Sequence, residues 1–311
     1  MENKKKIWIW CGGMAAGIAV CLCIWGIAHH HTQAQSDQEE PARTNYYNNV
    51  LANPPLPETL TFCGEPVPLD DPMVRESLDR ELTAVCYQHS TTLLCLKRAR
   101  RYFPVIEKIL KEDTVPEDIK YLCVAESSLS NAISPAKAVG FWQFLEATAK
   151  SYGLTINDDV DERYDLEKST HAACKYLKKG KKSLGKWSLA AAGYNMGDGG
   201  VRKNINNQSQ DEYWDLYLNS ETARYVYRIL AYKLLFENPD LYGVRLNESD
   251  KYAPYDCEEI TITSSIPNLY TFCQENGMTY KELKTLNPWL RSTKLTVSSG
   301  KSYTIKKFKK K

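Results

Sequence analysis

The sequence lacks a strong net charge of either sign. Its 311 residues include 40 Lys and Arg against 38 Asp and Glu, so the formal net charge is +2. Residues 1–6 contribute +2 and residues 306–311 contribute +5, which leaves −5 for the body between them. A mildly acidic body offers no broad basic surface to a phosphate backbone, so we expect no nucleic acid partner.

Paired cysteine motifs are also missing. Seven of the ten cysteines lie beyond residue 28, at positions 63, 86, 95, 123, 174, 257 and 273. None has the Cys-x-x-Cys spacing of a zinc site or a redox motif, and an odd number cannot all pair. Cys86, Cys95, Cys123 and Cys174 fall within helix-like apolar patterns, and we interpret them as small buried hydrophobic residues.

Long hydrophobic runs are absent except at the N-terminus. Residues 7–28 carry no charge, and these 22 residues are just enough to cross a hydrocarbon core of roughly 30 Å as a helix. The preceding lysines 4–6 favour a cytoplasmic N-terminus. We therefore expect a single transmembrane anchor with the body outside the cytoplasm. A cleaved signal is the alternative, because Thr32-Gln33-Ala34 could serve as a cleavage site.

The segment after this run predicts a tether. Residues 29–58 are polar, rich in Gln, Asn and Pro, and without apolar periodicity. The run His29-His30-His31 could bind a metal, but a solvated stretch beside the membrane is the favoured interpretation. We expect neither a metal nor a cofactor in this protein.

The body predicts a mainly α protein with a small α+β domain. Helical patterns dominate from residue 59 to about 245, punctuated by residues such as Pro104. Strands and helices do not alternate along this region, so we do not expect a parallel sheet. After a polar stretch at 245–258, short β-branched runs at 260–262 and 303–305 flank two helix-like segments, which predicts a βααβ unit. The expected domains are a basic cytoplasmic segment 1–6, an anchor or signal 7–28, a linker 29–58, a helical domain 59–245 with its motif core at 114–235, the βααβ domain 257–306 and a basic tail 307–311.

A carboxylate occupies a position where the helical pattern requires a buried residue. The segment Thr114-Val115-Pro116-Glu117 has the form of a capping box, so it predicts a helix with its first residue as the N-cap. The apolar positions Ile119, Leu122 and Cys123 step by three and four, and the next position of that stripe is Glu126. Desolvation there would raise the pKa of the carboxyl group, as a general acid requires. The alternative is a structural glutamate tied to an arginine or a helix end.

Three further motifs follow in order. Ser134-Pro135 turns the chain, Gly140-Phe141-Trp142-Gln143 opens another helix-like run, and an Ala-rich helix ends near Gly193-Tyr194-Asn195. Trp142 offers a face for stacking on a ring, and Gln143 supplies both a donor and an acceptor. Ordinary helix packing explains each motif by itself, so a functional interpretation depends on the motifs occurring together in this order.

Together these motifs resemble the family 1 lytic transglycosylases of the goose-type lysozyme superfamily. The resemblance also includes Glu221-Thr222 with Tyr225-Val226, covers most of residues 60–245 and implies a lysozyme-like helical catalytic domain. One departure is Gly193, where the family usually has Ala.

The resemblance implies roles for the matched residues. Glu126 would be the single catalytic acid and base. Ser134 would lie near its carboxylate or the N-acetyl group of the substrate, and Tyr225 would close the cleft. The residues expected to contact substrate are Ser134, Gln143, Tyr194, Asn195, Tyr225 and Trp142.

The implied chemistry uses one carboxylate. Most glycosidases use two acidic groups, but the nearest acidic residues, Glu146 and Asp198, suit solvated helix-end positions. The resemblance implies cleavage of the β-1,4 bond between N-acetylmuramic acid and N-acetylglucosamine of peptidoglycan, with 1,6-anhydromuramyl ends as products, in cell-wall turnover. A muramidase that hydrolyses the same bond and a noncatalytic peptidoglycan-binding scaffold are the alternatives.

The C-terminal unit resembles a degenerate LysM module, which implies binding to peptidoglycan glycan strands. It has Ser264-Ser265-Ile266-Pro267 where the family has Gly-Asp-Thr-Leu, in a loop that contributes glycan contacts in the family. Asn287 and Trp289 are the candidates for sugar contact. The implied location is a bacterial cell envelope, with the body on the periplasmic side of its anchor, or secreted to the periplasm if the signal is cleaved.

Overall fold

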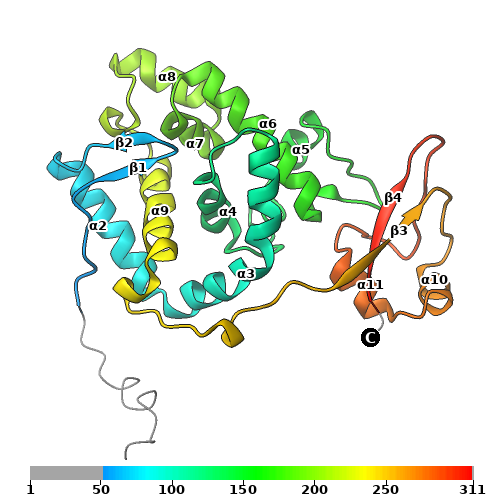
Figure 1. Cartoon of the computed structure of the whole chain (residues 1–311). Helices are drawn as coiled ribbons and strands as arrows, with labels where there is room; N and C mark the ends of the chain where they lie inside the picture. Colours follow the sequence, from blue (N-terminus) through cyan, green and yellow to red (C-terminus); the bar gives the residue numbers. More distant parts are fainter. Residues whose placement is uncertain (1–51, 310–311) are drawn as a thin grey trace, which may run out of the picture. The chain divides into compact units, whose positions relative to one another are not determined.

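The computed structural model describes residues 52–309. The predicted basic segment 1–6, the anchor or signal 7–28 and most of the linker 29–58 therefore lie outside the described residues. Between residues 52 and 309, no helix is long and apolar enough to cross a membrane. The compact unit that begins at Asn53 is mainly helical, with a small strand-containing part at its C-terminal end (Figure 1). The prediction of a mainly α fold is confirmed.

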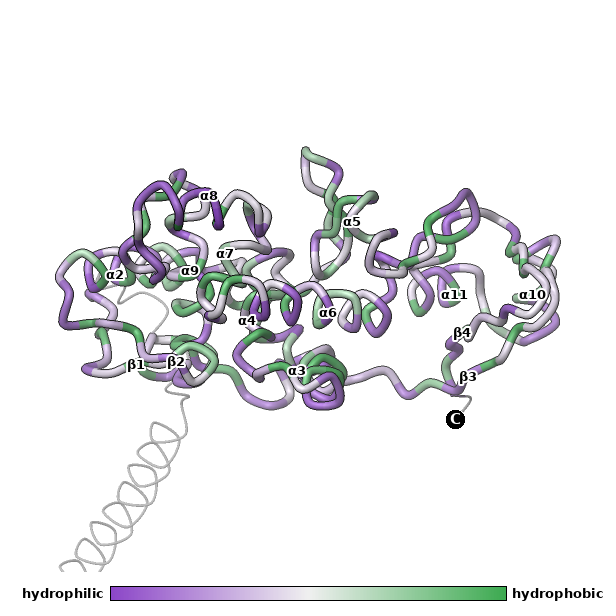
Figure 2. Tube along the Cα trace, turned by 90° about the horizontal axis from the view of Figure 1, so that it is seen from above, coloured by the Kyte–Doolittle hydropathy of each residue, from purple (hydrophilic) through white to green (hydrophobic). Residues whose placement is uncertain are grey.

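Eight described helices form the larger part, in a chain order that follows the predicted motifs. They are α2 (Pro72–Tyr87), α3 (His89–Glu112), α4 (Ile119–Ser127), α5 (Glu146–Ser151), α6 (Leu166–Leu184), α7 (Trp187–Met196), α8 (Asp198–Gln208) and α9 (Ser220–Glu237). The 3₁₀ turns are η2 (Glu162–Tyr164), η3 (Tyr213–Asp215), η4 (Pro239–Tyr242) and η5 (Glu248–Asp250). Figure 2 shows that α8 is largely polar, whereas α7 is largely apolar. Because residues 188–193 of α7 are all buried, its apolar sequence is the one that a core helix requires.

A short antiparallel hairpin precedes these helices. Strand β1 (Leu60–Phe62) pairs with β2 (Glu65–Val67). The turn between them places Cys63 and Gly64 at φ 54° and 80°, and the Cys63 amide donates to the carboxylate of Asp118 at 2.7 Å. We expected helical patterns from residue 59, because strands of three residues are too short to show a period of two.

Helix α9 packs against α2, α4 and α7 (Figure 1). Asn219 caps its first turn, since its side-chain oxygen accepts from the amides of Glu221 (3.1 Å) and Thr222 (3.0 Å). Buried residues continue along the helix from Thr222 to Leu235. A helix enclosed by three others has little freedom to rotate or slide, so the side chains that project from it are held in place.

Pro104 lies inside α3 rather than at its end. Proline removes a backbone donor and usually kinks or breaks a helix. Here the residues before and after it bury the same face of the helix against the core, with Leu96 and Ala99 on one side and Ile106 and Ile109 on the other. The helix continues because tertiary packing outweighs the lost hydrogen bond.

The predicted capping box before α4 is wrong. Thr114 has φ 56°, and α4 begins at Ile119 with Asp118 in the N-cap position and no side-chain cap. The carboxylate of Glu117 pairs forward with Lys120 at 2.5 Å instead of reaching back. The Asp118 carboxylate is occupied by the hairpin amide described above, so a long-range contact has replaced the local cap.

The seven cysteines between residues 52 and 309 are free thiols. Cys95, Cys123 and Cys174 are fully buried in the helical core, as their apolar patterns predict, and Cys86 is half-buried.

The C-terminal part has the predicted βααβ order. Its elements are β3 (Cys257–Ile262), α10 (Leu269–Glu275), α11 (Tyr280–Leu286) and β4 (Tyr303–Phe308). The strands are antiparallel, with Ile260 opposite Ile305. Thr279 and Glu282 form a reciprocal capping box at the start of α11. Residues 307 and 308 belong to β4, so the strand extends into the predicted basic tail.

The two predicted sugar contacts, Asn287 and Trp289, lie in the core of this part. The Asn287 side chain is fully buried; it donates to the carbonyls of Leu283 (3.0 Å) and Lys306 (2.7 Å) and accepts from the Lys306 amide (2.7 Å). Trp289 is 5% exposed and stacks on Tyr303 at 5.4 Å between ring centroids. This corrects the prediction of sugar contact. The polar atoms of Asn287 bond to α11 and β4, and the ring of Trp289 packs on β4.

A loop of the helical part contacts the βααβ part. The Asp159 carboxylate accepts from the Ser292 hydroxyl (2.8 Å) and the Thr296 amide (3.0 Å). The Arg291 guanidinium lies 4.2 Å from the centroid of the Tyr164 ring. These contacts surround a shared apolar cluster in which Val160 and Tyr164 pack with residues of the βααβ part.

We expect Asn287→Ala to destabilise the protein strongly. The substitution removes a buried partner from both the amide and the carbonyl of Lys306, at a cost of about 2–4 kcal/mol in free energy of unfolding. Urea unfolding followed by Trp fluorescence measures the change. The matched control is Asn276→Ala, which removes one bond from a half-buried side chain and should cost less than about 1 kcal/mol. Equal losses in the two variants would contradict the role assigned to Asn287.

Candidate active site

Glu126 is the next-to-last residue of α4, and the chain changes direction directly after it. Ser128 and Leu129 are in the left-handed region at φ 53° and 54°, and Arg98 of α3 donates to the Ser128 carbonyl at 2.9 Å. The Glu126 carboxyl group is partly enclosed, and its burial raises its pKa to about 7. A carboxyl group with this pKa can both donate and accept a proton near neutral pH.

Three side chains of α9 adjust this pKa. The Tyr225 hydroxyl donates to Oε1 of Glu126, which stabilises the charged form and lowers the pKa. The charge of Glu221 raises the pKa and the charge of Arg228 lowers it. Burial is the largest effect, so the net shift is upward.

Ser134 and Gln143 build the turn that follows α4. The Ser134 hydroxyl accepts from the Ala138 amide at 3.0 Å. Gln143 has φ 49°, and its Nε2 donates to the carbonyls of Ala132 (3.0 Å) and Gly140 (2.8 Å). Its Oε1 makes no hydrogen bond to any residue between 52 and 309. Both predicted substrate contacts therefore also hold the backbone of this turn.

The same turn rests on the backbone of η2. Gly140 has φ 85°, and a Cβ built there would lie 2.0 Å from the Arg163 carbonyl oxygen. The Arg163 guanidinium pairs with Asp161 at 2.7 Å and donates to the Phe144 carbonyl at 3.2 Å. Only glycine permits this close approach of two backbone segments.

Trp142 is a core residue, which corrects the prediction that it stacks on a ligand. Its side chain is fully buried, and Nε1 donates to the Thr170 hydroxyl at 2.8 Å. Its carbonyl accepts from the Tyr194 hydroxyl at 2.7 Å. The indole face is used in packing, and only the backbone of this residue turns toward Tyr194.

Tyr194 and Asn195 connect α7 to the other helices of the site. Burial raises the pKa of Tyr194 well above its usual range, and the charge of Glu126 raises it further, so the two side chains share one enclosed environment. Asn195 donates to Glu221 at 3.2 Å and accepts from the Thr222 hydroxyl at 2.7 Å. The ends of α4 and α7 and the start of α9 thus meet around Glu126 (Figure 1).

The start of α7 is held by a residue that no motif includes. Its own N-cap residue, Lys186, offers no capping side chain. The Glu65 carboxylate from β2 instead accepts from the amides of Trp187 (2.8 Å) and Ser188 (3.2 Å) and pairs with Lys181 at 2.7 Å. A carboxylate at a helix N-terminus is stabilised by the helix dipole. The single sequence signal for this contact was the absence of a capping residue before Trp187.

Asp198 explains why position 193 is glycine. A Cβ at Gly193 would lie 2.5 Å from Oδ1 of Asp198. Burial raises the pKa of Asp198, and its Oδ1 is enclosed without a hydrogen-bond partner among the described residues, so the predicted solvated position is wrong for this residue. Glu146 does occupy an exposed helix start, where it pairs with Lys150 at 2.6 Å.

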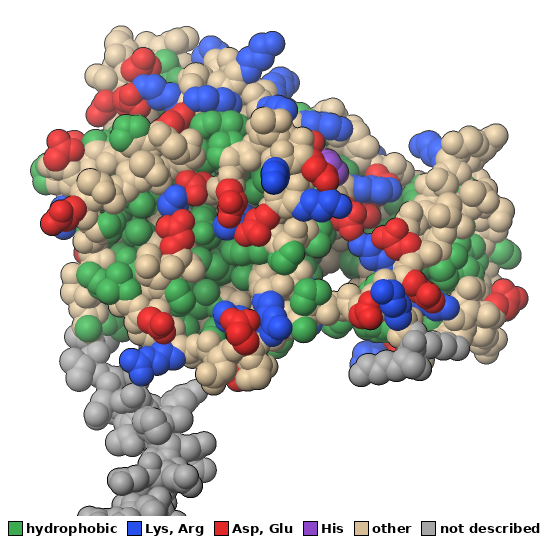
Figure 3. Space-filling model, viewed as in Figure 1, with side chains coloured by type: hydrophobic (Ala, Val, Ile, Leu, Met, Phe, Trp, Pro, Cys, Tyr) green, Lys and Arg blue, Asp and Glu red, His purple; other side chains and the backbone are tan. Residues whose placement is uncertain are grey.

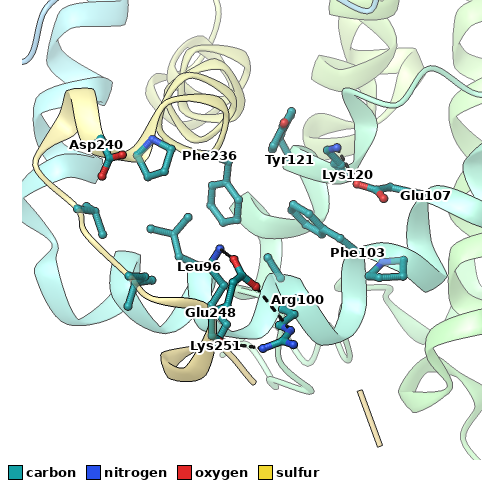
Figure 4. Close-up of a pocket in the computed structure, with 15 residues that line it drawn as sticks. Leu96, Arg100, Phe103, Glu107, Lys120, Tyr121, Phe236, Asp240, Glu248 and Lys251 are labelled. Atoms are coloured by element: carbon teal, nitrogen blue, oxygen red, sulfur yellow. Dashed lines mark hydrogen bonds and ion pairs between the residues drawn. The ribbon is translucent and has the colours of Figure 1, made fainter. Parts of the chain in front are cut away.

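A pocket of about 570 Å³ lies on another side of α4 (Figure 4). Figure 4 shows the rings of Phe103, Tyr121 and Phe236 facing it, with Glu248 ion-paired to two basic side chains at its rim. Tyr121 and Glu126 are five residues apart and project about 140° apart around the helix. This pocket is therefore separate from the surroundings of the Glu126 carboxyl group.

Two families match successive parts of the chain. Residues 103–217 match the transglycosylase SLT domain, and residues 258–307 match the soluble lytic transglycosylase C-terminal LysM-like domain. The chain therefore contains an SLT transglycosylase domain followed by a LysM-like domain, and the resemblance drawn from the motifs is confirmed.

The chain is also similar to two named proteins. Membrane-bound lytic murein transglycosylase D of Escherichia coli (strain K12) is 30% identical over 253 residues, which cover 78% of this chain and 54% of the relative. A putative tributyltin chloride resistance protein of Alteromonas sp. (strain M-1) is 30% identical over 123 residues, which cover 39% of this chain and 59% of that protein. The chain spans about half the length of the transglycosylase relative.

We expect Gly193→Ala to destabilise the fold by about 1–3 kcal/mol, because the new methyl group overlaps the Asp198 carboxylate. Adding Asp198→Ala should recover most of this loss, which a double-mutant cycle of unfolding free energies measures. Gly199→Ala is the matched control, since a Cβ at that helical position meets nothing within 4 Å. Additive effects of the first two substitutions would show that the contact does not select glycine.

Proposed function

We propose that the chain is a peptidoglycan lytic transglycosylase with Glu126 as its single catalytic acid and base, on a lysozyme-like helical domain. The observation that carries this proposal is an enclosed carboxyl group with a pKa of about 7, hydrogen-bonded to Tyr225, inside an SLT domain. The name of the Escherichia coli relative supports murein as the substrate.

In the proposed reaction, Glu126 first donates a proton and later accepts a different one. Its carboxyl group protonates the glycosidic oxygen between N-acetylmuramic acid and N-acetylglucosamine. The bond between C1 of the muramyl residue and that oxygen breaks, and the oxygen leaves as a hydroxyl of N-acetylglucosamine. The N-acetyl carbonyl of the substrate stabilises the positive centre through an oxazolinium intermediate. The Glu126 carboxylate then takes the proton of the muramyl C6 hydroxyl, whose oxygen closes the 1,6-anhydro ring. No water is consumed.

The surrounding side chains position the sugar in this proposal. Tyr225 orients the carboxyl group and stabilises its charged form after the first proton transfer. Oε1 of Gln143, which has no partner among residues 52–309, accepts from a sugar hydroxyl, while Ser134, Tyr194 and Asn195 line the same subsites. A partly enclosed site strengthens each of these polar contacts relative to water.

The proposed setting is a bacterial cell envelope. The LysM-like domain supports binding to peptidoglycan strands, and the printed name of the relative supports a membrane-associated enzyme. Residues 7–28 would anchor the chain with its body in the periplasm, or would be removed as a signal.

Glu126→Gln should reduce turnover of purified peptidoglycan by about 10²–10⁴-fold, because the amide neither donates nor accepts the transferred proton. Mass spectrometry of the released muropeptides gives the reaction type. For the unsubstituted chain, products one water lighter than hydrolysis products support a transglycosylase and full-mass products indicate a muramidase. No release by that chain indicates a scaffold. The control, Glu146→Gln, changes an exposed glutamate and should retain activity. Normal turnover by Glu126→Gln would refute the assignment.

The pH profile tests the groups that adjust Glu126. Activity requires the protonated acid, so kcat/KM should fall as pH rises through about 7. Tyr225→Phe removes a bond to the charged form, so the descending limb should move to higher pH. Glu221→Gln removes a repelling charge, so that limb should move to lower pH. A shift of both variants in the same direction would contradict the placement of these groups around Glu126.

A further inference from the structure

Three arginines gather on one buried carboxylate close to the candidate acid. Glu81 of α2 is 1% exposed. It accepts from the Nε atoms of Arg80 (3.3 Å), Arg224 (2.5 Å) and Arg228 (3.3 Å). One negative charge faces three positive charges, so two positive charges are left without an acidic partner among the described residues.

The outer nitrogens of these guanidinium groups have no hydrogen-bond acceptor in the described part of the chain. Each arginine binds Glu81 through Nε, and no acceptor between residues 52 and 309 bonds to their Nη atoms. The side chains of Arg80, Arg224 and Arg228 are 54%, 42% and 33% exposed. On the face shown in Figure 3, acidic and basic side chains are mostly interspersed. A guanidinium fixed at Nε presents its paired Nη donors in a plane that matches a carboxylate.

The cluster lies beside the row of α9 that carries Tyr225. Arg224 and Arg228 are four residues apart and share one side of the helix. Arg228 follows Tyr225 by three residues, so the two side chains project about 60° apart. The charge of Arg228 reaches Glu126 and lowers the pKa of that carboxyl group. Arg228 and Tyr225 therefore project from adjacent sides of α9, and Tyr225 bonds to the candidate acid on α4.

We propose that Arg224 and Arg228, fixed by Glu81, form a subsite for a carboxylate that hangs from a muramyl residue of the substrate. The proposal rests on the proposed function. A muramyl residue carries either a free lactyl carboxylate or, where a stem peptide is attached, the carboxylates of that peptide. An N-acetylglucosamine residue carries none. Binding the charged residue would fix the register of the strand over Glu126. The bond at C1 of a muramyl residue, and not the bond at C1 of N-acetylglucosamine, would then lie at the carboxyl group.

Binding measurements in the Glu126→Gln chain test the subsite without turnover. Calorimetry compares three ligands: strands with stem peptides, amidase-stripped strands with free lactyl carboxylates, and a chitooligosaccharide of the same length. We expect Arg224→Gln to weaken binding of a carboxylate-bearing ligand about tenfold, with chitooligosaccharide binding unchanged. A loss confined to the first ligand assigns the subsite to the peptide, and a loss confined to the second assigns it to the lactyl group.

Two companion variants separate recognition from damage to the fold. Arg224→Lys retains the charge without the planar fork and should lose less affinity than Arg224→Gln. Lys175→Gln removes an exposed charge from α6 and should alter none of the three affinities. Thermal unfolding checks that each variant is folded. Equal losses for all three ligands, or no loss for either muramyl ligand, would overturn the proposal.

The turnover assay keeps this inference distinct from the proposed function. A chain with intact Glu126 that releases no product would refute the proposed reaction. Arginine-dependent binding of muramyl strands in the same preparation would leave the carboxylate subsite standing.

Discussion

The Glu126 carboxyl group is partly enclosed at the end of α4, and side chains of the surrounding helices stabilise its charged form. A buried carboxylate is costly unless hydrogen bonds and nearby charges stabilise it. Here one tyrosine hydroxyl and one arginine charge offset part of the cost, while Glu221 adds to it. The result is a proton that is neither tightly held nor lost at neutral pH.

Helix α9 supplies most of this compensation, so its position decides the chemistry. Its first turn bonds to the end of α7 through Asn195, its middle reaches Glu126 through Tyr225, and its outer side is tied to α2 through Glu81. The Glu65 carboxylate holds α7 from the other end. A small displacement of α9 would change several of these contacts together, because they radiate from one helix.

The sequence predicted the mainly α body, the βααβ unit and the ordered motifs, because helical and strand periodicities are local properties. Prediction from the sequence failed where a side chain bonds to or packs against a residue that is distant in the chain. Asp118 caps no helix because the β1–β2 turn uses its carboxylate, Pro104 stays inside α3 because both flanks are packed, and Trp142 is buried because Thr170 receives its indole N–H. Asn287 likewise serves β4 rather than a ligand.

The sequence by itself determined which residues are candidates for catalysis. The apolar helical pattern that ends at Glu126, and the order of the later motifs, depend only on residue types and their spacing. Tertiary structure alone decided how those groups behave. The pKa of Glu126 depends on enclosure and on charges that come from α9, a hundred residues away, and the two unbalanced charges beside Glu81 arise only when α2 and α9 pack. Burial and long-range pairing act through space, and no local pattern encodes them.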